Sequence, residues 1–277
     1  MTDKYAVIGN PISHSKSPLI HAAFAKQTNQ DMSYEAILAP IDGFEAKVKE
    51  LIEQGYKGAN VTVPFKFAAS AVCTFQSEEA KLAGAVNTLS FIANKSYGYN
   101  TDGNGLINDI TKNLAHVFKD KRVLLLGAGG AAQGVFQPIF LEHPALIVVA
   151  NRTFDKAENM ISNMSGKDTK TTVIKPYAFN ELCNLQFDII INATSAGLTD
   201  TALPISSNIF AKNCLAYDMM YSRETPFMAL ARAAGAQVAD GLGMLVEQAA
   251  EAFYLWRNVR PQTAPVITIL NNSVPKA

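Results

Sequence analysis

A chain of 277 residues with 48% hydrophobic and 17% charged residues can form one or two folded domains, and this composition excludes intrinsic disorder. The 24 Lys and Arg residues balance the 24 Asp and Glu residues, so we expect no nucleic-acid partner. No apolar run approaches the roughly 20 residues that span a bilayer, so we expect no membrane segment. The first residues do not have the pattern of a secretory signal. The separated cysteines Cys73, Cys183 and Cys214 indicate neither a disulfide framework nor a metal site, which favours a cytoplasmic location.

Short strand-like runs alternate with helical stretches along the chain, which predicts an α/β fold with largely parallel sheets. Ser17 is the predicted N-cap and Pro18 the first residue of a helix that runs to Thr28. A second helix is predicted to end at Gln54 before Gly55, and Pro64 ends a strand. The elements predicted in this half are the strands 4–9, 34–39 and 59–63, the helices 17–28 and 44–54, and a hairpin of 85–93 with 97–100.

A second unit is predicted from Arg122 onward, beginning with the compact buried strand 123–126. An amphipathic helix is predicted from Leu242 to Trp256, and the segment from Val259 to Ala277 is left unassigned. The further strands predicted in this half are 146–150, 187–192, 215–219 and 237–239.

The strand 123–126 runs directly into a G-x-G-x-x-A motif at the start of a helix, which is the context of a dinucleotide-binding turn. Glycine permits the tight turn and lets backbone N–H groups approach a pyrophosphate, while Ala132 keeps the helix close to the strand. The alternative is a glycine-rich turn that only lets a helix pack on a sheet. The predicted cofactor-binding residues of this turn are Gly127, Ala128, Gly129, Gly130 and Ala131.

The residues after the next strand indicate NADP rather than NAD. NAD-binding folds place an acidic residue there against the ribose 2′-hydroxyl, whereas this chain has Asn151, Arg152 and Thr153. A guanidinium group binds a 2′-phosphate with paired hydrogen bonds, and the two neutral side chains can add to them. Lys156 either adds charge to the same phosphate or is a solvated surface lysine.

Polar residues follow several strands of the first half of the chain. Asn60 and Thr62 alternate with valines and so share one face of their strand, and Lys66 lies just beyond its carboxyl end. Asn87 and Asp102 lie in two further polar segments, GAVNT and NTDG. Neutral hydrogen-bonding groups around one lysine and one aspartate are suited to a polyhydroxylated acid.

The chain resembles the shikimate dehydrogenase family. The segments that carry the resemblance occur in the family's order between Gly9 and Ala250: GNPISHSKSP, GANVTVPFK, GAVNT, NTDG, GAGGAA, NRT, INATSAG, YDMMY and DGLGMLVEQAA. The resemblance implies reversible reduction of 3-dehydroshikimate to shikimate with NADPH, in aromatic amino acid biosynthesis. It also implies a substrate domain of residues 1–101 and 242–277 and a Rossmann-type NADP domain of residues 102–241, with a C-terminal helix returning to the first domain.

The resemblance assigns roles to individual residues. Lys66 and Asp102 correspond to the family's catalytic pair. The implied substrate-binding residues are Ser15 and Ser17 for the carboxylate, Asn60, Thr62, Asn87 and Gln248 for the ring hydroxyls, and Tyr221 nearby. Further implied cofactor-binding residues are Thr194, Met219 and Gly241. The plain structural alternatives are that Ser17 only caps its helix, Met219 only fills the core and Gln248 lies on a solvated helix face.

Two other functions fit the same motifs. One is a quinate/shikimate dehydrogenase that uses NAD or NADP, although Arg152 argues against NAD. The other is a non-catalytic module that senses the same acid and nucleotide, which the intact Lys66 and Asp102 disfavour. The sequence is compatible with a monomer or a homodimer.

Overall fold

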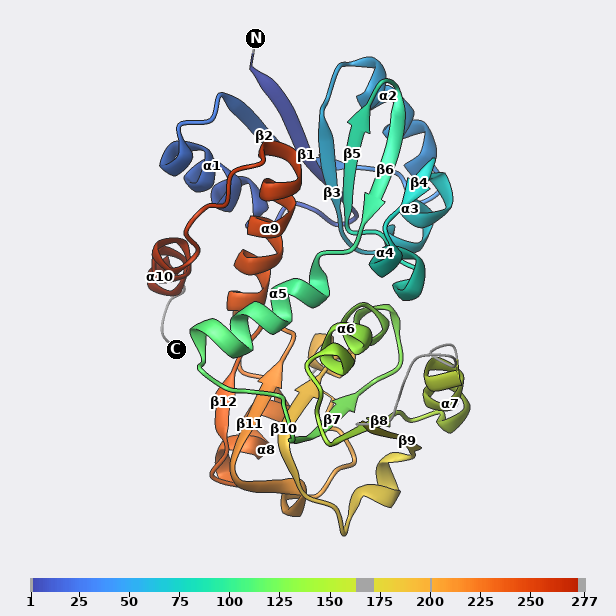
Figure 1. Ribbon diagram of the computed structural model, residues 1–277, viewed down its shortest axis with the longest axis vertical. Helices are drawn as coiled ribbons and strands as arrows, with labels where there is room; N and C mark the ends of the chain where they lie inside the picture. The colour runs from blue at the N-terminus through green and yellow to red at the C-terminus, as the bar shows by residue number, and fades with distance from the viewer. Residues whose placement is uncertain (1, 163–171, 200, 274–277) are drawn as a thin grey trace. The chain divides into compact units, whose positions relative to one another are not determined.

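The computed structural model describes residues 2–162, 172–199 and 201–273, and the chain forms two compact units. The first unit contains Met1–Gly105 together with Leu245–Ala277, and the second contains Leu106–Met244. The chain therefore passes between the units twice, after Gly105 and after Met244, where the sequence places the crossings near Thr101 and Gly241. Each unit is built around one six-stranded sheet (Figure 1).

The sheet of the first unit is mixed, with the strand order β2-β1-β3-β5-β6-β4. β1 pairs in parallel with β2 and β3, β5 pairs antiparallel with β3 and β6, and β4 pairs in parallel with β6. The strands are β1 (Asp3–Gly9), β2 (Met32–Leu38), β3 (Gly58–Val61), β4 (Phe75–Gln76), β5 (Thr88–Ile92) and β6 (Lys95–Tyr99). These directions place the ends of β1, β3 and β6 and the start of β5 at the same edge of the sheet.

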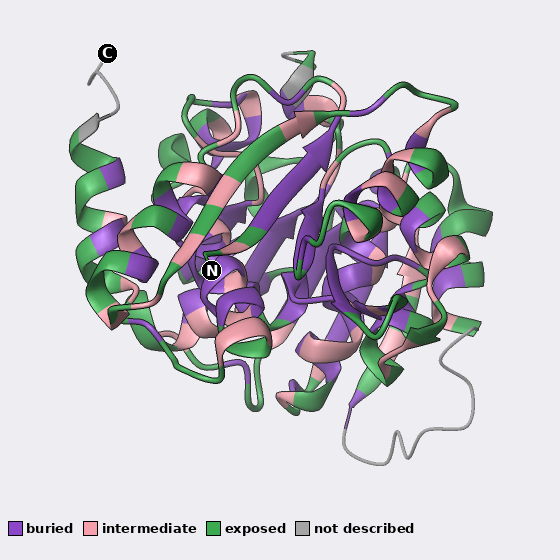
Figure 2. Cartoon of the chain, turned by 90° about the horizontal axis from the view of Figure 1, so that it is seen from above, coloured by how far each residue is buried: buried purple, intermediate pink, exposed green. Residues whose placement is uncertain are grey.

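Helices bury both faces of this sheet. Ile8 and Val61 pack in one apolar cluster with Phe44 and Leu51 of α2, while Phe24 of α1 contacts Phe253 of α9 edge to face. The central strands are correspondingly buried in Figure 2. The helices of this unit are α1 (Ser17–Thr28), α2 (Phe44–Glu53), α3 (Lys66–Val72), α4 (Glu78–Ala83), α10 (Ala264–Ser273), and the parts of α5 (Asp102–Asn108) and α9 (Leu242–Arg257) that fall within it.

Most predicted elements of the first unit are present, with differences at helix starts and in short elements. The prediction of Ser17 as an N-cap is wrong, because Lys16 occupies that position and Ser17 is the first helical residue. β3 ends at Val61 rather than Val63, because the chain already turns where the Phe65 N–H donates to the Thr62 carbonyl at 3.0 Å. α3, β4 and α4 have only seven, two and six residues, and no sequence pattern predicted them.

The sheet of the second unit is entirely parallel, with the strand order β12-β11-β10-β7-β8-β9. The strands are β7 (Arg122–Leu126), β8 (Leu146–Ala150), β9 (Val173–Tyr177), β10 (Phe187–Asn192), β11 (Phe210–Asp218) and β12 (Gln237–Ala239). The chain proceeds outward from β7 first to one side and then to the other, which is the doubly wound arrangement, and its switch point lies between β7 and β10. The helices α6 (Gly130–Leu141), α7 (Phe154–Ser162) and α8 (Pro226–Ala233) and a π-helical turn (Asp109–Asn113) complete this unit.

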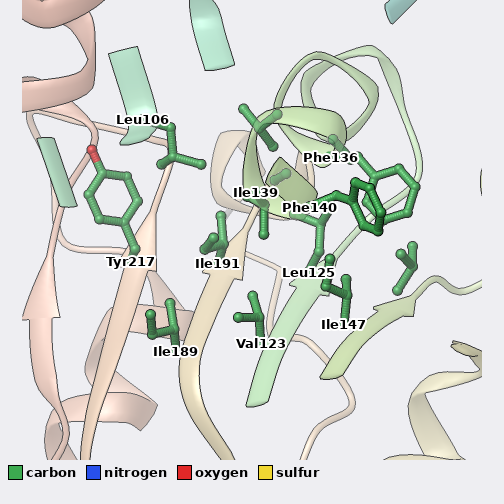
Figure 3. Packing of buried hydrophobic residues seen from close by; sticks show 14 of the residues in the cluster. Leu106, Val123, Leu125, Phe136, Ile139, Phe140, Ile147, Ile189, Ile191 and Tyr217 are labelled. Carbon is green, nitrogen blue, oxygen red and sulfur yellow. The ribbon is translucent and has the colours of Figure 1, made fainter. Parts of the chain in front are cut away.

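The core of the second unit explains why its strands are short apolar runs. Figure 3 shows Leu125 of β7 and Ile191 of β10 next to Phe136 and Ile139 of α6, on one face of the sheet. Leu124 belongs to a separate apolar cluster with residues of the other face. Strands covered on both faces need apolar side chains at consecutive positions, so the run 123–126 shows no alternation.

The predicted α/β fold, with a doubly wound second unit, is confirmed. β8, β10 and β12 have their predicted bounds. β9 was missed because Lys175 and Pro176 interrupt its apolar pattern, and an edge strand tolerates proline. The segment from Val259 includes α10. None of the helices within the described ranges combines the length and hydropathy that crossing a membrane requires.

Candidate active site and dinucleotide site

Lys66 and Asp102 form an ion pair in the first unit. Lys66 begins α3 just after β3, and Asp102 begins α5 just after β6, so both lie at the shared edge of the sheet. Lys66 Nζ lies 2.6 Å from Asp102 Oδ2, and the side chains are 28% and 10% exposed. The structure therefore brings together the two residues assigned to the catalytic pair and leaves the lysine side chain partly exposed.

The Asp102 carboxylate is fixed from its other side. Asn87 Nδ2 donates to Asp102 Oδ1 at 2.8 Å, while the Asp102 backbone N–H donates to Asn100 Oδ1 at 3.1 Å. Each carboxylate oxygen thus has its own partner, and an acidic residue in the first turn of a helix is favoured by the helix dipole. The carboxylate is held in one orientation toward Lys66.

A network of neutral groups extends from Asn87. Asn87 Nδ2 also donates to Thr101 Oγ1 at 3.0 Å and, at 3.4 Å, to Oε1 of Gln248 on α9. Asn60 Nδ2 donates to Thr88 Oγ1 at 3.0 Å. Asn60, Asn87 and Gln248, which the sequence analysis proposed from distant segments, therefore belong to one hydrogen-bonded cluster, and Gln248 is not on a solvated helix face.

The remaining predicted substrate-binding residues lie at the ends of strands. Ser15 and Ser17 follow β1, and the Ser17 N–H donates to Ser15 Oγ at 3.3 Å. Thr62 follows β3, and its methyl group lies against Gly9 at the end of β1. Tyr221 belongs to the second unit, and burial raises the pKa of its hydroxyl.

The glycine-rich turn of the second unit has the geometry of a phosphate-binding turn. Gly127 has a φ of 104°, and a Cβ there would lie 3.1 Å from the Ala193 carbonyl at the end of the neighbouring strand. A Cβ on Gly129 would meet nothing within 4 Å among the described residues. Gly130 begins the twelve-residue helix α6, and the N–H groups of the first helical turn can donate to an anion. Together with the open space over Gly129, this helix start is suited to a pyrophosphate.

The residues predicted to select NADP follow β8 at the same end of the sheet. Arg152, Thr153 and Lys156 are exposed, and Asn151 Nδ2 donates to the Thr153 carbonyl at 2.9 Å. This hydrogen bond shapes the turn that presents Arg152. Arg152 and Lys156 are positively charged, and the residue that follows the strand is Asn151 rather than an acidic residue. This segment is therefore suited to a 2′-phosphate.

A buried carboxylate that sequence analysis missed organises the ends of β10 and β11. Asp218 is fully buried and accepts hydrogen bonds from Asn192 Nδ2 at 3.0 Å, the Met220 N–H at 2.9 Å and Thr225 Oγ1 at 2.6 Å. Asn192 Oδ1 in turn accepts from Thr194 Oγ1 at 2.7 Å. The only sequence signal for this role was an acidic residue at the end of an apolar strand.

The other predicted cofactor-binding residues lie in the segments that Asp218 organises. The Met219 N–H donates to the Asn192 carbonyl at 3.0 Å, and the Gly241 N–H donates to the Met220 carbonyl at 2.9 Å. A Cβ on Gly241 would lie 2.4 Å from the Met219 carbonyl, so this close approach requires glycine. Within the described residues no group of His, Cys, Asp and Glu side chains is arranged to hold a metal ion.

A doubly wound dinucleotide-binding unit joined to a second α/β unit that carries a lysine–aspartate pair defines a class of two-domain nucleotide-dependent oxidoreductases. Three family models match the chain: "Shikimate dehydrogenase substrate binding domain" at residues 7–89, "Shikimate / quinate 5-dehydrogenase" at residues 109–201, and "Shikimate 5'-dehydrogenase C-terminal domain" at residues 241–270.

Individual relatives agree with these matches. A protein of Methylobacillus flagellatus named "Shikimate dehydrogenase (NADP(+))" is 56% identical over 97% of this chain and 98% of its own length. A shikimate 5-dehydrogenase of Thermus thermophilus, solved with NADP(H) and shikimate, is 29% identical with a TM-score of 0.86, covering 98% of this chain and 99% of that one. An Ael1 enzyme of Pseudomonas putida is 44% identical with a TM-score of 0.92, covering 97% of this chain and 98% of that one. The chain belongs to the shikimate dehydrogenase family.

Proposed function

We propose that the protein catalyses the reversible, NADP-dependent reduction of 3-dehydroshikimate to shikimate. The observation that carries the proposal is the Lys66–Asp102 pair, whose atoms Nζ and Oδ2 are 2.6 Å apart among neutral hydrogen-bonding side chains. The names of the relatives support the substrate and the cofactor.

Lys66 is proposed to move the proton that accompanies hydride transfer. In ketone reduction its ammonium group donates a proton to the oxygen that becomes the hydroxyl, and in alcohol oxidation its amine takes the proton back. Asp102 orients Nζ and stabilises its positive charge, while Asn87 holds the carboxylate in place. The Lys66 side chain is partly exposed, and the Asp102 carboxylate is held in place by its hydrogen bonds.

The first unit is proposed to bind the substrate. Ser15 and Ser17 supply hydroxyl groups for the carboxylate, and Asn60, Thr62, Asn87 and Gln248 supply partners for the ring hydroxyls. These groups are neutral, so they can distinguish donors from acceptors without adding charge beside Lys66. Their gathering at one sheet edge and in one hydrogen-bonded network supports this role.

The second unit is proposed to bind NADP, whose nicotinamide supplies the hydride chemistry when it is bound. The turn from Gly127 to Ala131 would hold the pyrophosphate, with space above Gly129 for it. Arg152, with Asn151, Thr153 and Lys156, would bind the 2′-phosphate. The residues proposed to line the rest of the cofactor are Thr194, Met219 and Gly241, in the segments fixed by Asp218.

A cytoplasmic location fits the three cysteines, which are all free thiols. A monomer or a homodimer stays a prediction.

A spectrophotometric assay at 340 nm tests the function. We expect shikimate-dependent reduction of NADP, a weaker rate with NAD, and little or no rate with quinate. Comparable rates with quinate would identify a quinate/shikimate dehydrogenase. Tight binding of shikimate and NADP without turnover would identify a sensing module and contradict the proposal.

A further inference from the structure

Tyr34 lies on β2 and is in direct contact with the network that contains the proposed substrate-binding residues. Its hydroxyl donates to Asn60 Oδ1 at 2.7 Å. β2 is an edge strand of the first sheet, paired with β1 rather than with β3, which carries Asn60. The tyrosine therefore reaches across β1 to Asn60, and no pattern in the sequence links the two residues.

The orientation of the Asn60 amide can be assigned from its neighbours. Asn60 Nδ2 lies 3.3 Å from the backbone carbonyl of Asn87 and 3.0 Å from Thr88 Oγ1. A carbonyl oxygen only accepts hydrogen bonds, so the amide NH2 must face Asn87 and Oδ1 must face Tyr34. The Tyr34 hydroxyl is consequently the donor, and its hydrogen bond holds Asn60 Oδ1 in the orientation that the Asn87 carbonyl selects.

Aromatic packing fixes the ring that carries this hydroxyl. The imidazole of His21 stacks on Tyr34 with ring centroids 4.1 Å apart and an angle of 8° between the planes. Trp256 of α9 lies against the same ring at 6.3 Å, and its indole N–H donates to the Leu89 carbonyl at 3.0 Å. With these two neighbours in place, the Tyr34 hydroxyl is held at a fixed position.

The Tyr34 hydroxyl also interacts with Ser17. Burial raises the pKa of Tyr34 well above its usual value, and a hydrogen bond from the Ser17 side chain opposes this shift. Because its single proton is donated to Asn60 Oδ1, the Tyr34 oxygen can only accept from Ser17.

We propose that Tyr34 is a positioning residue for substrate recognition, acting chiefly through Asn60. This inference rests on the proposed function, because it concerns how the same site binds shikimate. Tyr34 orders the amide before the substrate arrives, which lowers the entropic cost of binding. It does not take part in proton or hydride transfer.

Tyr34→Phe tests this role, because it removes the hydroxyl and keeps the ring. We expect the KM for shikimate to rise roughly 5- to 30-fold, as for loss of one hydrogen bond in a buried network. We expect kcat and the KM for NADP to stay within about twofold, because the hydroxyl donates to Asn60 and not to the lysine pair. A change in kcat and both KM values together would indicate a general structural defect and overturn the proposal.

Three further variants sharpen the test. Tyr56→Phe is the matched control, because Tyr56 donates to Glu35, the neighbour of Tyr34 on β2, away from the network. It should leave the KM for shikimate unchanged. His21→Phe keeps the phenol and a stacked ring, and should keep that KM within about twofold. In an Asn60→Ala background, Tyr34→Phe should raise the KM by less than about threefold, because the hydroxyl then has no amide to orient.

The outcomes separate the two proposals. A wild-type protein without shikimate-dependent NADP reduction would overturn the proposed function and this inference with it. An active wild-type protein whose Tyr34→Phe variant has an unchanged KM for shikimate would overturn the inference alone. Full additivity of Tyr34→Phe with Asn60→Ala would also contradict it.

Discussion

The buried imidazole of His21 makes the stability of the first unit depend on pH. Its side chain is fully buried, and neither ring nitrogen has a hydrogen-bond partner of normal geometry among the described residues. Burial lowers the pKa of His21 from 6.5 to about 3, and a weak interaction with Asn60 opposes the shift. The folded protein therefore holds this imidazole neutral at pH values where an unfolded chain protonates it.

The sign of the effect follows from these two pKa values. Above pH 6.5 the imidazole is neutral in both states, so the stability present there is unaffected by this group. As the pH falls from 6.5 toward the folded-state pKa near 3, the unfolded chain alone binds the proton, and stability is lost by about 1.4 kcal/mol per pH unit. At pH 5 the loss from His21 amounts to about 2 kcal/mol.

Urea unfolding at pH 7.5 and pH 5.0 measures this loss. Trp256 is the single tryptophan and lies 5.4 Å from the His21 ring, so its fluorescence follows unfolding of the first unit. We expect the loss of unfolding free energy between the two pH values to be about 2 kcal/mol smaller in His21→Phe than in the wild type. The comparison is between pH values within each protein, so any packing cost of the larger ring cancels.

His14→Asn is the matched control, because His14 is exposed and lies in the same unit as His21 and Trp256. Its pH dependence should equal that of the wild type. An equal loss in His21→Phe and in the wild type would refute the conclusion that His21 is kept neutral by burial.

Three further outcomes are expected from the second unit. Arg152→Gln should raise the KM for NADP roughly 10- to 100-fold and that for NAD less than about threefold in steady-state assays, because only NADP carries the 2′-phosphate. Gly127→Ala should lower the urea midpoint, because its φ of 104° and the Ala193 carbonyl oppose a Cβ, whereas Gly129→Ala should keep the midpoint and lose NADP affinity in a titration. Asp218→Asn should cost about 2–3 kcal/mol of unfolding free energy in urea, because the amide NH2 would face a hydrogen-bond donor. Equal KM changes for both cofactors, equal midpoints for both glycine variants, or a wild-type midpoint in Asp218→Asn would contradict these interpretations.

Local sequence patterns predicted β8 and β10 well because these strands are buried on both faces, whereas β11 begins at Phe210 rather than at the predicted Leu215. The run Phe187–Asn192 is apolar at nearly every position and is bounded by polar residues, so its limits are visible in the sequence. In the edge strand β9 this signal fails, because β9 needs neither a continuous apolar run nor a full set of N–H donors and includes Pro176. The N-cap of α1 also could not be predicted, since Ser17 and Pro18 fit either of two starting positions.

The candidate site was predictable where residues follow strands and unpredictable where contacts depend on register. Lys66 and Asp102 both follow strands, and strand order then brings them to one edge, although pairing them relied on the family resemblance. The contact of Tyr34 with Asn60 requires the pairing of three strands and a particular rotamer, neither of which is encoded by local pattern. Asp218 was missed partly for the same reason, because Asn192 lies on the neighbouring strand, although Met220 and Thr225 follow Asp218 in the chain.

The proposal that Lys66 transfers the proton is tested most directly by the kcat of Lys66→Ala with saturating shikimate and NADP. The matched control is Lys81→Ala, which removes another lysine at 2.6 Å from a carboxylate, that of Glu78, outside the site. We expect kcat to fall by roughly 10²- to 10⁴-fold in Lys66→Ala, with a much smaller change in KM, and to remain at the wild-type value in Lys81→Ala. A kcat near that of the wild type in Lys66→Ala would contradict the proposed chemistry.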